Sequence, residues 1–399
     1  MAAHKTIPVA EPVIGERELE YVSDAVRSGW VSSIGKYFNE FERGISSACG
    51  ADEAISTSSG TAALHLALAS LGIGAGDEVI VPSLTFIATA NAVRYVGATP
   101  IFADSDPKHW CIDPADIERC LTDRTRAIIP VHLYGHPADM DAILAIARPR
   151  GILVIEDAAE ALGTTYRGKP VGALGDAGVF SFYGNKLITT GEGGMLVTNS
   201  RSLADRARLL RDHAMSPERR YWHEEIGFNF RMTNMQAALG VAQVEQMPRF
   251  LERKIAISQR YRESFAGLPG IDMQTEAAWA GSSCWMATLQ VSPGFGLDRD
   301  GLGEALADRG VDTRPVFLPI HTMPPYREAR VLPNAQRIAR HGISLPSAAS
   351  LSEQDQSYVI DCVHQIVCGV TLSRRRRPIA ATSVASEAES ADHELREAA

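Results

Sequence analysis

Residues 61–104 read TAALHLALASLGIGAGDEVIVPSLTFIATANAVRYVGATPIFAD and switch repeatedly between two patterns. The segments 61–71 and 85–96 are helix-patterned, whereas 78–83 and 99–104 are short apolar runs of the kind found in buried strands. Such alternation favours parallel strands joined by crossover helices.

The same alternation continues to about residue 200. Further buried strands are expected at 127–135, 152–159, 178–184 and 194–199, with a helix at 140–150. Near-continuous apolar strands of this kind belong to parallel sheets covered by helices on both faces. The sequence therefore predicts an α/β domain built on a mostly parallel sheet.

The pattern changes towards the C-terminus. A long helix is expected from 233 to 265, with Pro248 marking a break or kink. It is followed by a strand at 283–291, a helix at 300–309 and an irregular, Pro-rich segment at 314–326. We expect a large α/β domain over 1–245, which includes the N-terminal segment, and a smaller α+β domain over 246–372.

Residues 373–399 form the end of the chain. They open with four arginines, Arg374–Arg377, and continue with almost no large apolar residue. A segment of this composition cannot bury enough surface to offset its ordering entropy. We expect a disordered, solvated tail, although a run of four arginines would also suit an acidic partner.

Composition excludes several classes of protein. The chain has 399 residues, and 39 Lys and Arg against 48 Asp and Glu give a net charge of -9, which argues against nonspecific binding to nucleic acid. The six cysteines lack zinc-site and disulfide-framework spacing, so we expect free thiols, no metal and a cytoplasmic protein. No apolar run approaches the roughly 18 residues of a membrane span.

Lys186 is the first candidate catalytic residue. It lies in the segment GVFSFYGNKLITTGEGGMLVTN (178–199), between two expected strands and among Gly and Thr residues. A lysine between apolar walls loses solvation of its charged form, which makes its amine a better nucleophile or Schiff-base former. The alternative is an ordinary solvated lysine in a turn.

Asp157 is the second candidate, at the end of the strand in VIEDAAEALG (154–163), with Glu160 one helical turn further on. In open α/β sheets the ligand crevice lies beyond the carboxyl ends of the strands. A carboxylate there would pair with a protonated ring nitrogen, as in pyridoxal phosphate enzymes. The alternatives are a helix N-cap or a magnesium ligand, and the absence of a GxxxxGK[ST] loop weakens the second.

A third signal is the segment ISTSSGTAALHLAL (55–68), where Ser59, Gly60 and Thr61 lead into a helix. A helix N-terminus offers unpaired N–H groups and a favourable dipole to a phosphate. Simple N-capping is the alternative.

Motifs of two other enzyme classes are not supported. GIGAG (72–76) precedes a strand, whereas a dinucleotide-binding fingerprint must follow one. The G-x-S-x-G elbow of serine hydrolases is not present.

Taken in order, these motifs resemble one family. SGTAALHLAL, GDEVIVPSLTF, PVHLYG, VIEDAAEALG, FSFYGNKLITTGEGGM and GFNFRMTN are similar to the DegT/DnrJ/EryC1/StrS sugar aminotransferases, over about residues 7–368. The resemblance implies the aspartate-aminotransferase-like fold, fold type I, and the cofactor pyridoxal 5'-phosphate (PLP), with pyridoxamine 5'-phosphate (PMP) as its second form.

The resemblance also implies roles for particular residues. Lys186 would form the Schiff base with PLP and then act as base and acid, Asp157 would hold the ring nitrogen protonated, and Phe86 would stack on the ring. Glu160 would lie near the ring oxygen or Lys186. The phosphate would be bound by Ser59, Gly60, Thr61 and Ser181, with Asn229 reaching across from a second subunit.

The implied reaction has two halves. L-glutamate gives its amino group to form PMP and 2-oxoglutarate, and the amine then passes to a nucleotide-linked keto-sugar. Because carboxylates are bound well by an arginine fork, Arg231 and Arg314 are candidates for substrate binding, with His321 and Tyr326 as sugar or nucleotide contacts. A site shared between subunits implies a homodimer.

Three of the sequence motifs narrow the choice of sugar substrate. FSFYGNK, RRYWHEEIGFNFRMTN and RPVFLPIHTMPPY are most similar to family members that aminate C4 of GDP-4-keto-6-deoxymannose, for polysaccharide or antibiotic synthesis. TSSGT stands where many of those have an Asn pair, and RDHAM replaces a more glycine-rich stretch. A C3 amination, or a UDP- or dTDP-linked ketone, therefore stays open.

Three other activities are less well supported by the residues. The C3 dehydratases of the family have lost the lysine, whereas Lys186 is present. A noncatalytic PLP-binding regulator would be expected to lose Lys186 or Asp157, or to carry an added DNA-binding module. A nicotinamide dehydrogenase would need the missing dinucleotide fingerprint.

Overall fold

The fold is built on a seven-stranded sheet, in a computed structural model that describes residues 6–376. The spatial order of the strands is β1-β9-β8-β5-β4-β2-β3. Their bounds are Glu53–Thr57 (β1), Glu78–Pro82 (β2), Thr99–Ala103 (β3), Thr125–Ile128 (β4), Leu153–Asp157 (β5), Ala177–Ser181 (β8) and Gly194–Thr198 (β9).

Most neighbouring strands of this sheet run parallel. β2, β3, β4, β5 and β8 pair in parallel, whereas β9 is antiparallel to both β8 and β1. The β8–β9 register places Ser181 opposite Gly194. The mostly parallel sheet predicted from the apolar runs is confirmed.

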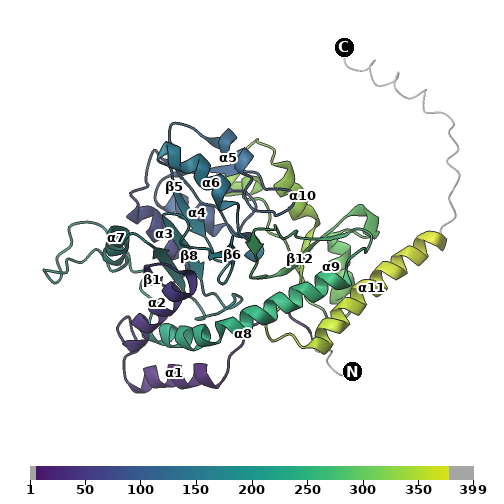
Figure 1. Cartoon of the computed structure of the whole chain (residues 1–399), viewed down its shortest axis with the longest axis horizontal. Helices are drawn as coiled ribbons and strands as arrows, with labels where there is room; N and C mark the ends of the chain where they lie inside the picture. Colours follow the sequence, from purple (N-terminus) through teal and green to yellow (C-terminus); the bar gives the residue numbers. More distant parts are fainter. Residues whose placement is uncertain (1–5, 377–399) are drawn as a thin grey trace, which may run out of the picture.

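Helices surround this sheet (Figure 1). Those predicted at 61–71, 85–96 and 140–150 are present as α3, α4 and α6, and α3 packs against β8 and β9. The bounds are Lys36–Cys49 (α2), Gly60–Ser70 (α3), Ala88–Tyr95 (α4), Pro114–Cys120 (α5), Met140–Ala147 (α6) and Arg201–Arg211 (α7). Connections between parallel strands run through such helices.

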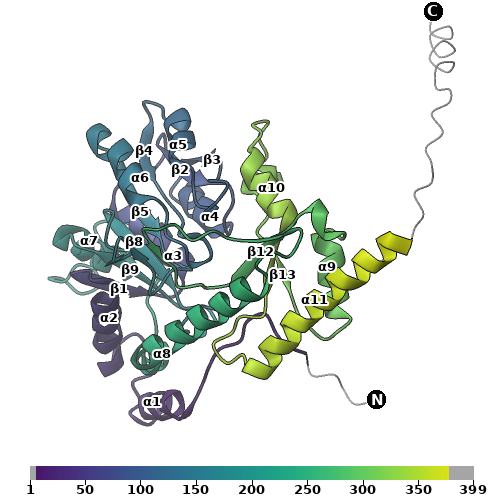
Figure 2. The same cartoon turned by 45° about the vertical axis from the view of Figure 1, so that its right-hand side comes forward.

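A second, antiparallel sheet forms the C-terminal part, in the order β10-β12-β14-β13. The strand predicted at 283–291 is β12, and the helix predicted at 300–309 is α9, which lies beside α11 (Figure 2). The bounds are Ile271–Met273 (β10), Ala287–Val291 (β12), Arg314–Pro315 (β13), Gly342–Leu345 (β14), Arg299–Ala307 (α9), Pro333–His341 (α10) and Glu353–Arg376 (α11).

The helix α8, Asn234–Ser264, links the two parts. It packs on α1 (Glu16–Arg27) and α2 at one end and on β12 and α11 at the other. A capping box of Thr233 and Gln236 starts it. The helix continues through Pro248, so of the predicted break or kink the break is wrong, and the kink remains a prediction. Side chains buried on both sides of the proline, such as Ala242 and Phe250, hold the two halves in place.

Buried side chains form two hydrophobic clusters. The first lies between the large sheet and the helices around it, and α10 also contributes to it through Ala335 and Ile338. The second lies between α8, α9, α11 and the smaller sheet, and it includes Ile7 from the N-terminal segment.

The domain boundary proposed at residue 245 lies inside α8 and remains a prediction. The predicted tail overlaps α11 as far as Arg376, and 377–399 lie outside the described residues.

Two details differ from the sequence pattern. The strand expected at 127–135 ends at Ile128, because Pro130 has no N–H group for a ladder hydrogen bond. The segment 53–57, which the sequence did not indicate as a strand, forms β1 at the edge of the sheet. Both differences matter for the site, since Tyr134 and Ser59 follow these two strand ends.

Candidate active site

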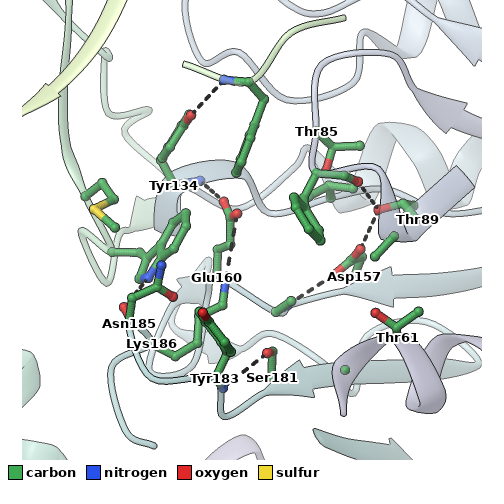
Figure 3. Close-up of a pocket in the computed structure, with 18 of the residues that line it drawn as sticks. Thr61, Thr85, Thr89, Tyr134, Asp157, Glu160, Ser181, Tyr183, Asn185 and Lys186 are labelled. Carbon is green, nitrogen blue, oxygen red and sulfur yellow. Dashed lines mark hydrogen bonds and ion pairs between the residues drawn. The ribbon is translucent and has the colours of Figure 1, made fainter. Parts of the chain in front are cut away.

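A cavity of about 560 Å³ opens at the carboxyl edge of the large sheet. Five strands of the same direction end there, namely β1, β2, β4, β5 and β8, and the loops that follow them supply most of the lining. Polar groups at this edge are therefore brought together from distant parts of the chain, as open α/β sheets commonly do. Figure 3 shows Lys186 and Glu160 on one side of the cavity and Asp157 on the other.

One end of the cavity is the N-terminus of α3. Ser59 caps the helix, and its Oγ accepts a hydrogen bond from the Ala62 N–H at 3.1 Å. The first N–H groups of a helix have no partner within it. A Cβ on Gly60 would lie 3.0 Å from the Cβ of Ser181, so glycine permits this close approach. Ser59, Gly60, Thr61 and Ser181 all line the cavity.

Asp157 ends β5 with its carboxylate buried. Its Oδ2 accepts a 2.7 Å hydrogen bond from the Thr89 hydroxyl, and its Oδ1 accepts one of 3.2 Å from the Ala159 N–H. Burial raises the pKa of Asp157, and the two hydrogen bonds act in the opposite direction. The carboxylate lacks a cationic partner within ion-pair distance among residues 6–376, so it is prepared for a positive group in the cavity.

Lys186 lies across the cavity from Asp157. Its side chain is 13% exposed, and its Nζ is 3.9 Å from Oε1 of Glu160. Burial lowers the pKa of Lys186, while the carboxylates of Glu160 and Asp157 oppose this change. Burial also raises the pKa of Glu160. A buried lysine with a lowered pKa is the arrangement that a nucleophilic amine requires.

Aromatic rings form the remaining wall. Tyr134 stacks on Trp285 at 5.8 Å and on Phe317 at 5.5 Å between ring centroids. Phe86 lines the mouth of the cavity and is 57% exposed. Its ring centroid lies 6.0 Å from that of Phe317. A flat ring entering the cavity would thus meet aromatic faces.

Arg314 is the one predicted substrate-binding residue that lines the cavity. Within the described part of the chain, its guanidinium has no ion pair or side-chain hydrogen bond. Asn229 and Arg231 do not line this cavity. Arg231 pairs with Asp212, and Asn229 lies between Phe228 and Phe230, whose rings stack on each other.

His321 and Tyr326 also lie outside the cavity lining. His321 is buried, with Nδ1 2.6 Å from Ser83 Oγ and Nε2 3.1 Å from Gln336 Nε2. The Tyr326 hydroxyl donates a 2.6 Å hydrogen bond to Oδ1 of Asn91. Both side chains therefore already bind protein groups, and their contact with a sugar or nucleotide remains a prediction.

The sequence did not indicate several lining residues. Thr89, Tyr134, Asn185 and Trp285 were not proposed as site residues, although Tyr134 and Asn185 lie in the motifs PVHLYG and FSFYGNK, because their roles depend on contacts between distant segments. In residues 6–376 no group of three or more His, Cys, Asp and Glu could hold a metal ion. Over the same residues, no helix is long and apolar enough to cross a membrane.

These residues fit PLP. The cavity offers a helix N-terminus for a phosphate, a buried carboxylate for a ring nitrogen and a buried amine for an aldehyde. A polar atom also lacks a partner there, since Oδ1 of Asn185 is buried and makes no hydrogen bond among the described residues. The donor set therefore matches a phosphorylated aromatic ligand.

Known proteins agree with this assignment. The model of the DegT/DnrJ/EryC1/StrS aminotransferase family matches residues 12–364. The GDP-perosamine synthase of Caulobacter vibrioides is 47% identical over 364 residues, which are 90% of this chain and 98% of that protein. The GDP-perosamine synthase of Escherichia coli O157:H7 is 45% identical over 362 residues, with the same coverage of each chain.

Solved structures of sugar aminotransferases have the same fold as this chain. Spr1654 from Streptococcus pneumoniae, in its PMP form, superposes with a TM-score of 0.87 at 29% identity and covers 92% of this chain and 100% of its own. Its PLP form gives a TM-score of 0.86, covering 92% and 99%. The fold type expected from the sequence is thereby confirmed, and the chain belongs to the DegT/DnrJ/EryC1/StrS aminotransferase family.

Proposed function

We propose that this PLP-dependent aminotransferase moves an amino group from L-glutamate to C4 of GDP-4-keto-6-deoxymannose and so makes GDP-perosamine. The observation that carries the proposal is the opposition of two buried groups, Lys186 and Asp157, across one cavity at the carboxyl edge of the sheet. Relatives called GDP-perosamine synthase support the choice of sugar, at 45% to 47% identity over nearly their whole length.

In this proposal the cavity holds PLP at three points. Asp157 would bind the ring nitrogen, Phe86 would cover the ring, and Ser59, Gly60, Thr61 and Ser181 at the N-terminus of α3 would hold the phosphate. When bound, PLP supplies an electron sink that makes the proton on the carbon next to the nitrogen removable. The Thr89 hydrogen bond keeps the carboxylate of Asp157 directed towards the ring nitrogen.

Lys186 would hold the cofactor and then move the proton. With its amine released by the amino donor, Nζ would take a proton from one carbon and return it to another. The lowered pKa leaves more of this amine unprotonated at neutral pH than an exposed lysine would have. Glu160 stays within 3.9 Å of Nζ and stabilises the ammonium that forms when the proton is taken.

Arg314 is our candidate for binding the donor. Its guanidinium lines the cavity without a protein partner among residues 6–376, which suits recognition of a carboxylate of L-glutamate by two parallel hydrogen bonds. Arg231 carries its positive charge beside Asp212 instead. Arg314 is therefore the stronger of the two carboxylate-binding candidates.

We further propose a homodimer in which Asn229 completes the phosphate site of the other subunit. Phe228 and Phe230 pack against His65 of α3, with ring centroids 4.6 and 5.4 Å from the histidine. Asn229 lies between them in an extended segment, where neighbouring side chains point in opposite directions. Its amide would thus be directed away from α3 of its own chain.

Two assays test the proposed function. The absorbance of the purified protein is recorded before and after addition of L-glutamate, with Lys186→Ala as control, and we expect the PLP band to give way to the PMP band only in the native protein. A panel of keto-sugars then follows, in which we expect GDP-4-keto-6-deoxymannose to give the highest kcat/KM. Preference for a UDP- or dTDP-linked ketone, or amination at C3, would refute the sugar assignment.

A further inference from the structure

The amine of Lys186 lies against the face of an aromatic ring that the sequence did not single out. Its Nζ is 3.8 Å from the centroid of the Trp285 ring. The Oε1 atom of Glu160 lies 3.9 Å from the same Nζ. The amine is therefore held between an aromatic face and a carboxylate, and both groups favour its charged form.

The indole of Trp285 has a fixed position. Its Nε1–H donates a 2.9 Å hydrogen bond to the carbonyl of Asn185, the residue before Lys186. Its backbone N–H donates to the carbonyl of Tyr134 at 3.1 Å, and the two rings stack with an interplanar angle of 15°. Trp285 is also 6% exposed, so it has little freedom to rotate.

Tyr134 joins the two groups that contact the amine. Its backbone N–H donates a 2.8 Å hydrogen bond to Oε2 of Glu160, which leaves Oε1 on the side of Lys186 (Figure 3). Tyr134 has a left-handed backbone conformation, with φ at 56°, which is uncommon for a residue other than glycine. Such a conformation persists only where the surroundings enforce it.

A buried lysine fixes the backbone behind the ring. Lys254 of α8 donates hydrogen bonds from Nζ to the carbonyls of Trp285 and Ser347. Ser347 follows β14 of the smaller sheet. The position of the indole is thus tied to the helix that links the two parts of the chain.

We propose that Trp285 is a positioning residue that holds the amine of Lys186 against Glu160 while the lysine is not bonded to the cofactor, most strongly once the amine has taken a proton. This inference rests on the proposed function for what the amine does. An unrestrained lysine side chain has several rotatable bonds, so a fixed resting place shortens the return of Nζ to the reacting carbon. The charged and titratable groups that face this amine or line its cavity are Glu160, Asp157, Tyr134, Tyr183, Glu192 and Arg314.

If Trp285 only fills space, its replacement by another apolar residue should leave the pKa of Lys186 unchanged. If Trp285 stabilises the ammonium, the same replacement should change that pKa. Burial lowers the pKa of Lys186, and the carboxylates of Glu160 and Asp157 oppose this change. The ring face 3.8 Å from Nζ also favours the ammonium, so its removal takes away a further stabilising contact. Trp285→Leu should therefore lower the pKa further, by about half to one unit.

The test measures that pKa in the full-length protein without cofactor. The chain has only six lysines, so labelling of Lys186 by fluorodinitrobenzene can be followed by peptide mass spectrometry across the neutral to alkaline range. Lys169, which is exposed, serves as the internal reference. Trp279→Leu is the matched control, because this ring packs on Tyr166 and His136 instead.

We expect the labelling midpoint of Lys186 to fall in Trp285→Leu, to fall less in Trp285→Phe, and to stay unchanged in Trp279→Leu. Trp285→Phe keeps an aromatic face and decides the question if the leucine variant fails to fold. An unchanged midpoint in the folded Trp285 variants, or one that rises because water has replaced the ring, would overturn the proposal.

Kinetics separate this inference from the proposed function. With L-glutamate, Trp285→Leu should lower kcat by about tenfold with little change in KM, since the ring positions the base and not the donor. If the labelling midpoint shifts but the protein aminates none of the keto-sugars, the proposed function fails alone. If amino transfer occurs while the midpoint and kcat stay native, only the role of Trp285 fails.

Discussion

The hydroxyl of Thr89 donates a 2.7 Å hydrogen bond to Oδ2 of Asp157, and both groups are buried at the base of the cavity. Thr89 belongs to α4, which follows β2, whereas Asp157 ends β5. A single helix residue thus fixes the orientation of the carboxylate proposed to bind the cofactor ring. It also offsets part of the effect of burial on the pKa of that carboxylate.

Replacing Thr89 by valine keeps the volume and removes this hydrogen bond. We expect kcat/KM for L-glutamate to fall by roughly 10- to 100-fold, the value of a hydrogen bond to a charged group. The acidic limb of the pH profile should move to higher pH, because the pKa of Asp157 rises without the hydroxyl. Thr89→Ser is the control and should remain close to native, whereas native kinetics in Thr89→Val would show that the hydrogen bond is dispensable.

A second prediction concerns the backbone at the phosphate end. A Cβ on Gly194 would lie 2.4 Å from the carbonyl carbon of Ser59, and backbone atoms cannot move aside easily. Gly194→Ala should displace the start of α3 and weaken PLP binding by at least about tenfold, measured as the Kd of the PLP-free protein. In the control Gly303→Ala, in α9, the new Cβ meets Thr313 at an ordinary 3.4 Å. Equal affinity in the two variants would contradict this role of the α3 N-terminus.

The pH dependence of stability provides a third prediction. Burial lowers the pKa of Lys254 from 10.5 to about 8. Between these values the unfolded chain binds more protons than the folded one, so the native protein gains stability as the pH rises. Compared with that of Lys254→Met, the free energy of unfolding of the native protein should rise by about 1–3 kcal/mol between pH 8 and 10.5.

Chemical denaturation at a series of pH values measures this difference. Lys169→Met, at an exposed lysine of the short strand β7 (Lys169–Pro170), is the control and should show no such dependence. A gap between the native protein and Lys254→Met that stays constant with pH would mean that the Lys254 amine titrates normally.

The proposed dimer can be tested by mixing two defective variants. Lys186→Ala lacks the amine, and Asn229→Ala lacks the amide expected to reach the other subunit. In a mixed dimer, one of the two sites would contain an intact Lys186 and an intact Asn229. Co-refolding equal amounts should therefore give a fraction of molecules with native PLP affinity and activity. Activity no higher than the sum of the separate variants would place Asn229 outside the shared site.

The sequence predicted those features that depend on neighbouring residues. The apolar runs at 78–83, 152–159 and 178–184 correspond to β2, β5 and β8, and the position of Asp157 at the end of β5 placed it at the carboxyl edge of the sheet. That Lys186 shares a site with Asp157 was implied only by the resemblance to the family.

Other features depend on packing between distant segments. Trp285 reaches Lys186 from a segment almost a hundred residues later in the chain, and no local spacing reports such a contact. The hydroxyl-rich segment 55–68 suggested only the approach to a helix, although residues 53–57 pair with β9 and form a strand. The contacts of the His321 ring with Ser83 and Gln336 in the interior could not be predicted from the sequence either, and its contact with the substrate remains a prediction.

The most direct test follows nitrogen from donor to sugar. The purified protein is incubated with PLP, GDP-4-keto-6-deoxymannose and L-glutamate labelled with heavy nitrogen, and the nucleotide-sugar product is examined by mass spectrometry and NMR. We predict an amino-sugar that carries the heavy nitrogen at C4, formed by the native protein and not by Lys186→Ala. A product without the label, or equal product from Lys186→Ala, would contradict the account.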